Sequence, residues 1–379
     1  MHGKHANADG DKIDQYESVS LDEELSLGLD ALLTDGSLEK FFSEIDVDHK
    51  VVLGAGFRDA VEKILRGEFA SAVDIFNLII KAMLGAIPKH LGNIVVIVSL
   101  AILYGISKNL NSGFAKEGVN KAVYYAIYAC IIAIVAVIVS DIFVSLKTTV
   151  EISVSVIEII FPVLLGLVSV IGGVTTVASF SAITLTFAGI VLKVTHYIVL
   201  PAFLAGTVFS LIGGLSKNTR FDKLASSVRT VAKWTMSITF GVLGTLSIAQ
   251  GIVGGSIDGV TIRSMKFATQ SYLPIVGGYI SDGFDIVAAS AVLLKNAVGL
   301  CIVVVLLLLV IRHIATIAMT SLLLKIAAGI IQPIADDGIS DMLYGVSKNV
   351  SIAIGLSVGV VFLPMVMIMS IVCAFNGGI

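Results

Sequence analysis

The hydrophobic positions of this chain form long uninterrupted runs, such as IIAIVAVIV at 131–139 and IVVVLLLLVI at 302–311. A helix needs about 20 apolar residues to cross the hydrocarbon core of a bilayer, whereas a transmembrane barrel needs alternating strands of about 10 residues. The pattern therefore predicts an all-α, polytopic membrane protein with about eight to ten membrane segments. The candidate segments are roughly 91–107, 122–146, 152–173, 176–193, 195–215, 234–254, 284–311, 314–334 and 350–375.

Composition supports this class. The 379 residues are 56% hydrophobic and only 14% charged, whereas soluble domains average about 45–50% apolar and about 25% charged residues. The charge is uneven: residues 1–50 hold 13 acidic side chains and four lysines, a net charge of −9, which leaves +6 for the remainder of a chain at −3. We expect residues 1–55 to form an acidic, partly disordered, extracytoplasmic region that does not favour nucleic acid.

Residues 56–90 carry two amphipathic stripes. The first places Phe57, Val61 and Ile64 on one helical face. The second starts at Phe69 and ends before Pro88. Such helices either lie on the membrane surface or pack on the protein's own membrane domain, which we assign to residues 91–379.

A short motif recurs along the chain. LYGISKN at 103–109 returns as LYGVSKN at 343–349, and GLSKN at 214–218 is a partial copy. Pro162 and Pro274 follow the first two copies at similar distances, and each is followed four residues later by a glycine. The pattern predicts two repeats, about 103–213 and 214–342, with helices broken at the two prolines as in many transporters and channels. Chance similarity among Gly/Ser-rich apolar segments is the alternative.

Basic residues in two connecting segments indicate the orientation. Segment 108–121 has three lysines against Glu117, and segment 217–233 has five basic residues against Asp222. The positive-inside rule places both in the cytoplasm, which leaves the acidic N-terminal region outside.

The segment 258–299, DGVTIRSMKFATQSYLPIVGGYISDGFDIVAASAVLLKNAVG, combines a helix breaker, two glycines and several charges between apolar stretches. A lipid-facing helix does not tolerate this combination. We expect it to be buried among helices, to line a wet cavity or to lie at the interface, with Lys295 paired to Asp282 or Asp285. The candidate structural or pathway residues are Pro162, Pro274, Gly277, Gly278, Asp282, Asp285 and Lys295.

Catalytic and cofactor motifs are missing from the sequence. It has no GxxxxGK[ST], HExxH or GxSxG pattern, and His196 and His313 are isolated within apolar segments. We therefore expect no enzymatic activity, no cofactor and no metal site. The spacing of Gly251, Gly255 and Gly259 indicates close helix packing, by default within the chain.

The segment 258–299 resembles the most recognisable block of the stage III sporulation protein AE family, and KIAAGIIQPIADDGISDMLYGVSKNV at 325–350 resembles the next block. The resemblance extends over roughly residues 55–379. It implies a multi-pass protein of the mother-cell membrane around the forespore, in the channel or feeding-tube complex that late forespore development requires. It also implies as partners a cytoplasmic secretion-type ATPase and extracytoplasmic ring-forming subunits of the same complex. No site residues follow from it.

Two functions remain open at this point. The chain is either a subunit of such a channel complex or an autonomous secondary transporter whose substrate site lies at the broken segments around Pro162 and Pro274. The residues alone favour the two equally, and the family resemblance favours the channel. A transporter should move a solute by itself in liposomes, whereas a channel subunit should be inert without partners.

Overall fold

The computed structural model describes residues 56–68, 72–110, 117–216, 219–272, 277–335 and 337–374, without the side chains of 277–286 and of 72, 109–110, 117, 185, 216, 219–220, 269–270 and 272. This part of the chain is helical, as the sequence predicts, and six of its helical runs are long and apolar enough to cross a membrane. The elements are α4 (Phe57–Leu65), α5 (Ala72–Leu110), α6 (Glu117–Val170), α7 (Val174–Val194), the π-helix η2 (Thr195–Val199), α8 (Leu200–Ser216), α9 (Thr219–Tyr272), α10 (Gly277–Ile331) and α11 (Asp337–Cys373).

Six long helical runs in the described residues replace the expected eight to ten segments, because neighbouring segments join. The α6 helix contains both 122–146 and most of 152–173, and α10 contains 284–311 together with most of 314–334. The 54 residues of α6 extend over about 80 Å, whereas the hydrocarbon core of a bilayer is about 30 Å thick. The bundle is therefore much taller than the membrane that it crosses.

Pro162 does not break its helix, although the sequence predicts a break there. Pro162 lies inside α6, which continues to Val170, and α5 runs through Pro88. Pro201 is accommodated differently, since the Leu200 N–H donates to the Thr195 carbonyl in the wider π turn. A wider turn relieves the clash between a proline ring and the preceding turn. Pro274 lies outside the described residues.

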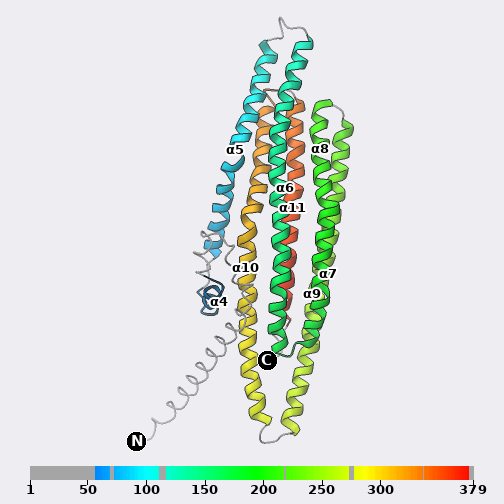
Figure 1. Cartoon of the computed structure of the whole chain (residues 1–379). Helices are drawn as coiled ribbons and strands as arrows, with labels where there is room; N and C mark the ends of the chain where they lie inside the picture. Colours follow the sequence, from blue (N-terminus) through cyan, green and yellow to red (C-terminus); the bar gives the residue numbers. More distant parts are fainter. Residues whose placement is uncertain are drawn as a thin grey trace, which may run out of the picture.

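The helices α6, α10 and α11 form the middle of the bundle, with α4 and α5 on one side and α7, α8 and α9 on the other (Figure 1). We call the end where α5 meets α6 and α8 meets α9 the basic end. The opposite end, which contains the α6–α7 turn and the connection from α9 to α10, is the hairpin end. There α9 and α10 extend beyond the C-terminal end of α11 (Figure 1).

The copies of the recurring motif lie at the basic end, where their glycines let backbones approach. A Cβ atom added to Gly105 would meet the Ile334 carbonyl oxygen, and one added to Gly345 would lie 3.1 Å from Ser210 Oγ. One added to Gly214 would meet the Gly338 carbonyl oxygen. Between these motifs the chain forms two pairs of long helices, α6 with α7–α8 and α9 with α10. The repeat boundaries themselves remain a prediction.

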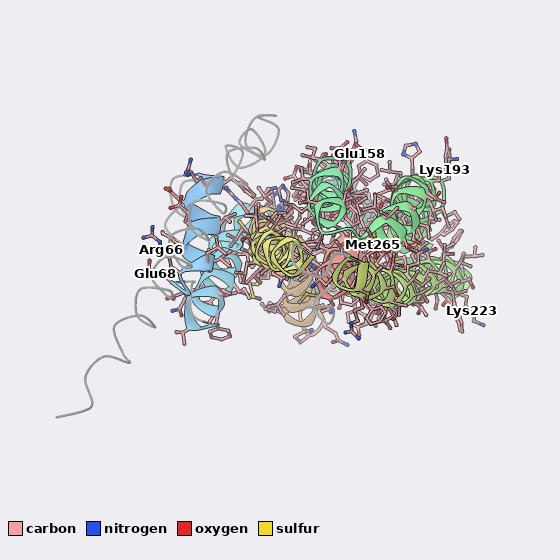
Figure 2. The ribbon with its side chains drawn as sticks, turned by 90° about the horizontal axis from the view of Figure 1, so that it is seen from below. Arg66, Glu68, Glu158, Lys193, Lys223 and Met265 are labelled. Carbon is pink, nitrogen blue, oxygen red and sulfur yellow. The ribbon has the colours of Figure 1, made fainter. Side chains whose placement is uncertain are left out.

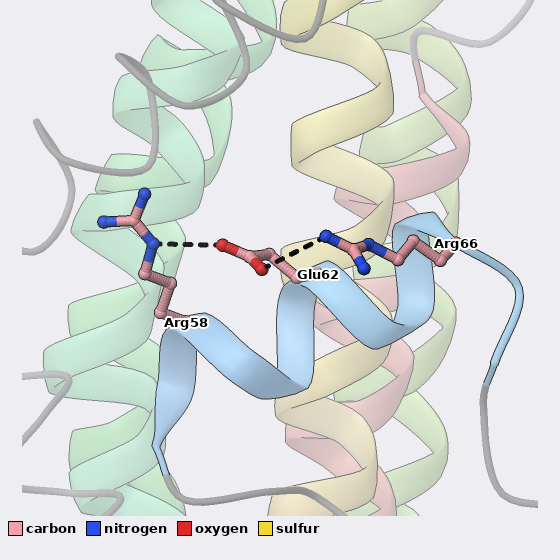
Figure 3. A network of polar contacts seen from close by, with 3 residues as sticks. All are labelled: Arg58, Glu62 and Arg66. Atoms are coloured by element: carbon pink, nitrogen blue, oxygen red, sulfur yellow. Dashed lines mark hydrogen bonds and ion pairs between the residues drawn. The ribbon is translucent and has the colours of Figure 1, made fainter.

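The amphipathic helix α4 packs on the protein's own bundle. Phe57, Ala60 and Val61 are buried, and α4 contacts α10. On the outer face, Glu62 accepts a hydrogen bond from Arg58 Nε at 3.0 Å and lies 3.9 Å from Arg66 Nη2 (Figure 3). Because exposed ion pairs contribute only about 0.2–1 kcal/mol, burial of the apolar face is what holds α4 in place.

We predict that Gly214→Ala destabilises the bundle by about 1–3 kcal/mol, because the added methyl group overpacks the contact with α11. The measurement is thermal unfolding of the purified protein in detergent. Gly189→Ala is the matched control, since its Cβ would meet nothing within 4 Å and alanine favours the helix. Equal unfolding temperatures for the two variants would contradict the close approach at Gly214.

Candidate functional site

An apolar band crosses the half of the bundle nearest the hairpin end. Residues 234–257 of α9 and 349–374 in and just after α11 contain no charged side chain. The α9 stretch is about 36 Å long, close to the hydrocarbon thickness of about 30 Å. Lys233 precedes it, the exposed Trp234 is its first residue and Asp258 follows it, in keeping with the aromatic and charged residues that mark membrane interfaces.

Asp258 lies at the edge of this band that is nearest the hairpin end. The residue is 2% exposed, and its carboxylate accepts hydrogen bonds from the backbone N–H groups of Thr175 at 2.9 Å and Thr176 at 2.8 Å. These N–H groups belong to the first turn of α7, which has no side-chain cap of its own. A carboxylate at a helix N-terminus satisfies orphan donors and favours the helix dipole. Asp258 thus ties α9 to the α6–α7 turn.

Lys295 forms a second tie at the same level. It is fully buried in α10, and its Nζ donates to the Val372 carbonyl oxygen at 2.9 Å. Val372 is the penultimate residue of α11, where carbonyls lack helical donors and a cation complements the helix dipole. Lys295 therefore caps the C-terminus of α11.

The sequence had led us to expect an ion pair of Lys295 with Asp282 or Asp285 and not this cap. The α10 helix is continuous from Gly277, so Asp282 and Asp285 lie about 20 Å and about 15 Å from Lys295 along its axis. Their side chains, like the side-chain surroundings of Gly277 and Gly278, lie outside the described part of the chain. The direct pairing expected from sequence is replaced by the bond to Val372.

The segment 258–299, in which the sequence combines a proline, two glycines and several charges, is a helical hairpin. Residues 258–272 end α9, and residues 277–299 begin α10. At its base Ile262, Ala288 and Ala291 pack around Ile171 of the α6–α7 turn. Further out, α9 extends past the C-terminal end of α11 (Figure 1), and Met265 in this last part of α9 is exposed (Figure 2).

A row of charged, hydroxyl and small residues, the α6 polar stripe, follows one outer face of α6. Successive members are three or four residues apart, which places them on the same side of a helix. They are Lys147, Glu151, Ser155, Glu158, Pro162, Gly166 and Ser169, all exposed or half-buried. Lys147 Nζ lies 3.5 Å from Glu151 Oε1, with both side chains more than half exposed. Glu158 forms no ion pair with the described residues and points away from the bundle (Figure 2).

A cavity of about 380 Å³ lies between the stripe and α7. Glu158, Pro162, Gly166 and Ser169 line it from α6, and Ser181 and Thr184 line it from α7. Because Pro162 has no N–H, the Glu158 carbonyl lacks its helical donor. Apolar side chains such as Phe161, Leu165 and Val177 form most of the remaining wall. Pro162 therefore leaves a backbone acceptor beside a largely apolar lateral cavity and does not break the helix.

The two sides of the apolar band differ. Glu158 precedes the end of α6 by about 18 Å, near the middle of the band. A charge at the bilayer centre costs about 2.5–3.5 kcal/mol, so the stripe requires water or a polar partner. On α9 the large exposed side chains of this stretch are apolar and suit contact with lipid, among them Ile238, Val242, Leu246, Ile252 and Val253.

Sequence reasoning missed Asp258 as a cap and missed the α6 polar stripe. The stripe has a readable signal, since its spacing of three and four residues is continuous from 147 to 169. Splitting α6 into two membrane segments hid it. The Asp258 contact has no local signal, because its partners at 175 and 176 are more than 80 residues away in the chain.

Comparison with known proteins gives one consistent answer. The family model described as Stage III sporulation protein AE matches residues 55–375. A curated relative named Stage III sporulation protein AE, from Bacillus subtilis (strain 168), is 23% identical over 335 residues, which cover 86% of this chain and 82% of the relative. No solved structure matches the chain.

We predict that Lys295→Glu destabilises the protein by about 3–5 kcal/mol, because a buried carboxylate would face the carbonyl end of α11 without a partner. The measurement is thermal unfolding in detergent together with the yield of folded protein from membranes. Lys325→Glu is the matched control on the same helix, because Lys325 is exposed. Folding of Lys295→Glu at the yield and stability of the control would refute the cap.

Proposed function

This chain belongs to the stage III sporulation protein AE family, and we propose that it is a membrane subunit of the channel, or feeding-tube, complex that connects mother cell and forespore. Family membership assigns it a role in sporulation, and the six long apolar helices among its described residues indicate a multi-pass membrane protein. The proposal adds that it acts in the mother-cell membrane around the forespore and is needed for late forespore development.

The α6 polar stripe carries this proposal. It runs along the outside of one chain, within a band whose other side is apolar. In the described residues the middle of the bundle is filled by packed apolar side chains, and the cavity beside the stripe lies between two helices at the periphery. A polar surface of this kind suits the wall of a conduit that forms between chains. We therefore assign the stripe to the conduit of an assembled complex.

The orientation of the bundle gives each end a partner in this proposal. The positive-inside rule assigns the basic end to the cytoplasm, where a secretion-type ATPase docks. The hairpin of α9 and α10 then extends into the space between the two membranes, toward the ring-forming extracytoplasmic subunits. The acidic N-terminal region lies on the same side. We assign no catalytic step and no cofactor to this chain, since the ATPase supplies the energy.

The alternative function is an autonomous secondary transporter, and the lateral cavity beside Pro162 is the observation that favours it. Two purified-protein results separate the functions. A transporter in liposomes moves a solute by itself, and Glu158→Leu abolishes that movement. A channel subunit is inert in liposomes and co-purifies with its partners from sporulating cells.

We predict that Glu158→Leu blocks late forespore development while the protein still accumulates in the membrane. An apolar side chain here removes charge from the conduit wall without disturbing the core, because Glu158 is exposed. The gene is deleted in the native endospore-forming host and replaced by each variant. A late forespore-specific transcription reporter is then followed after engulfment.

The deletion should complete engulfment, keep the reporter silent and let the forespore shrink, and the wild-type copy should restore the reporter. Lys325→Leu, which removes an exposed charge outside the stripe, should also restore it. Normal sporulation of the deletion strain would refute the family function. Full restoration by Glu158→Leu would refute the role of the stripe alone.

A further inference from the structure

A second, larger groove lies on the lipid-suited side of the bundle. Its volume is about 630 Å³, and it runs between α9 and the C-terminal end of α11. Exposed apolar side chains, among them Ile252, Val260 and Met369, form its walls, and Arg263 stands at its end on α9. This volume falls within the range of about 300–1,000 Å³ that is common for ligand sites.

Three glycines of α9 line this groove and differ in their surroundings. A Cβ atom on Gly251 would lie 2.8 Å from the Ser370 carbonyl oxygen, and one on Gly255 would meet the Ala374 carbonyl oxygen. Both glycines are thus used to seat the end of α11. A Cβ atom on Gly259 would meet nothing within 4 Å, so the groove is open at this position.

The groove also lies at a defined depth. Ile248 and Ile252 belong to the uncharged stretch of α9 that ends at Asp258. Arg263 is about 8 Å further along the helix axis, within the headgroup layer, which is about 5–8 Å deep on each side of the core. The groove therefore runs from the level of the hydrocarbon core to the level of the headgroups, where Arg263 is located.

These features identify the chemistry of the occupant. Exposed apolar side chains around the single open glycine, Gly259, suit a flexible acyl chain. A second helix, about 10–12 Å across, would need the glycine positions that α11 already covers. A guanidinium is the side chain that best complements a phosphate. We propose that this groove binds an anionic glycerophospholipid of the outer leaflet, with an acyl chain over Gly259 and the phosphate on Arg263.

Lipid binding by the purified full-length protein tests the site. The protein is reconstituted in phosphatidylcholine vesicles that contain phosphatidylglycerol, re-extracted in mild detergent and analysed by native mass spectrometry for retained lipid. Gly259→Leu fills the groove where there is space for it, so the fold should survive. We expect it to weaken retention of phosphatidylglycerol about tenfold or more, since one buried acyl contact surface and its phosphate contact are lost together.

Two matched controls and a headgroup comparison make the result specific. Gly241→Leu adds the same side chain at another open position of α9 outside the groove, and Lys266→Gln removes a nearby charge that does not line it. Both should retain phosphatidylglycerol like the wild type. Arg263→Gln should weaken retention of phosphatidylglycerol about tenfold but leave retention of diacylglycerol, which has no phosphate, unchanged.

Three results would overturn the proposal. Equal retention by Gly259→Leu and Gly241→Leu would mean that lipid does not occupy the groove. Retention that arises only after deletion of residues 375–379 would identify the chain's own end as the occupant. Loss of a dimer in Gly259→Leu with unchanged lipid retention would identify a second copy of the chain.

Discussion

Within a bilayer, a charged or polar group must be hydrogen-bonded, ion-paired or hydrated, and the architecture of this protein depends on that requirement. Asp258 meets it by capping the first turn of α7, and Lys295 meets it by capping the last turn of α11. Each contact uses a charge to close a helix end that would otherwise expose backbone groups. The two caps hold α7 to α9 and α10 to α11 at the same depth.

The α6 polar stripe meets the same requirement only in part within a single chain. Lys147 and Glu151 pair with each other, while Glu158 faces outward with no ionic partner among the described residues. The opposite side of the band, along α9, is apolar and carries the groove assigned to lipid. A chain with one side that suits lipid and one polar side has the properties expected of a subunit in the wall of a conduit. Its polar side becomes stable when other chains enclose water against it.

The class of the fold follows from the sequence, because runs of apolar residues have few alternatives to helices in a membrane. The number of helices does not, since the predicted segments end at charges such as Lys147 and Lys193. In the structure Lys147 lies inside α6, with Glu151 3.5 Å away. Of the three environments that the sequence left open for segment 258–299, Lys295 has the buried one. Its partner could not be foreseen, because Val372 is 77 residues away and contributes only a backbone carbonyl.

The central claim is that the outer face of α6 contacts water within the assembled complex. Spin labels placed singly at positions 151, 155, 158, 162 and 166, and at 238, 242 and 246 of α9, measure it directly in native membranes of sporulating cells. We predict high accessibility to a water-soluble nickel relaxant at the α6 positions and high accessibility to oxygen at the α9 positions. Lipid-like values at both sets of positions would contradict the account.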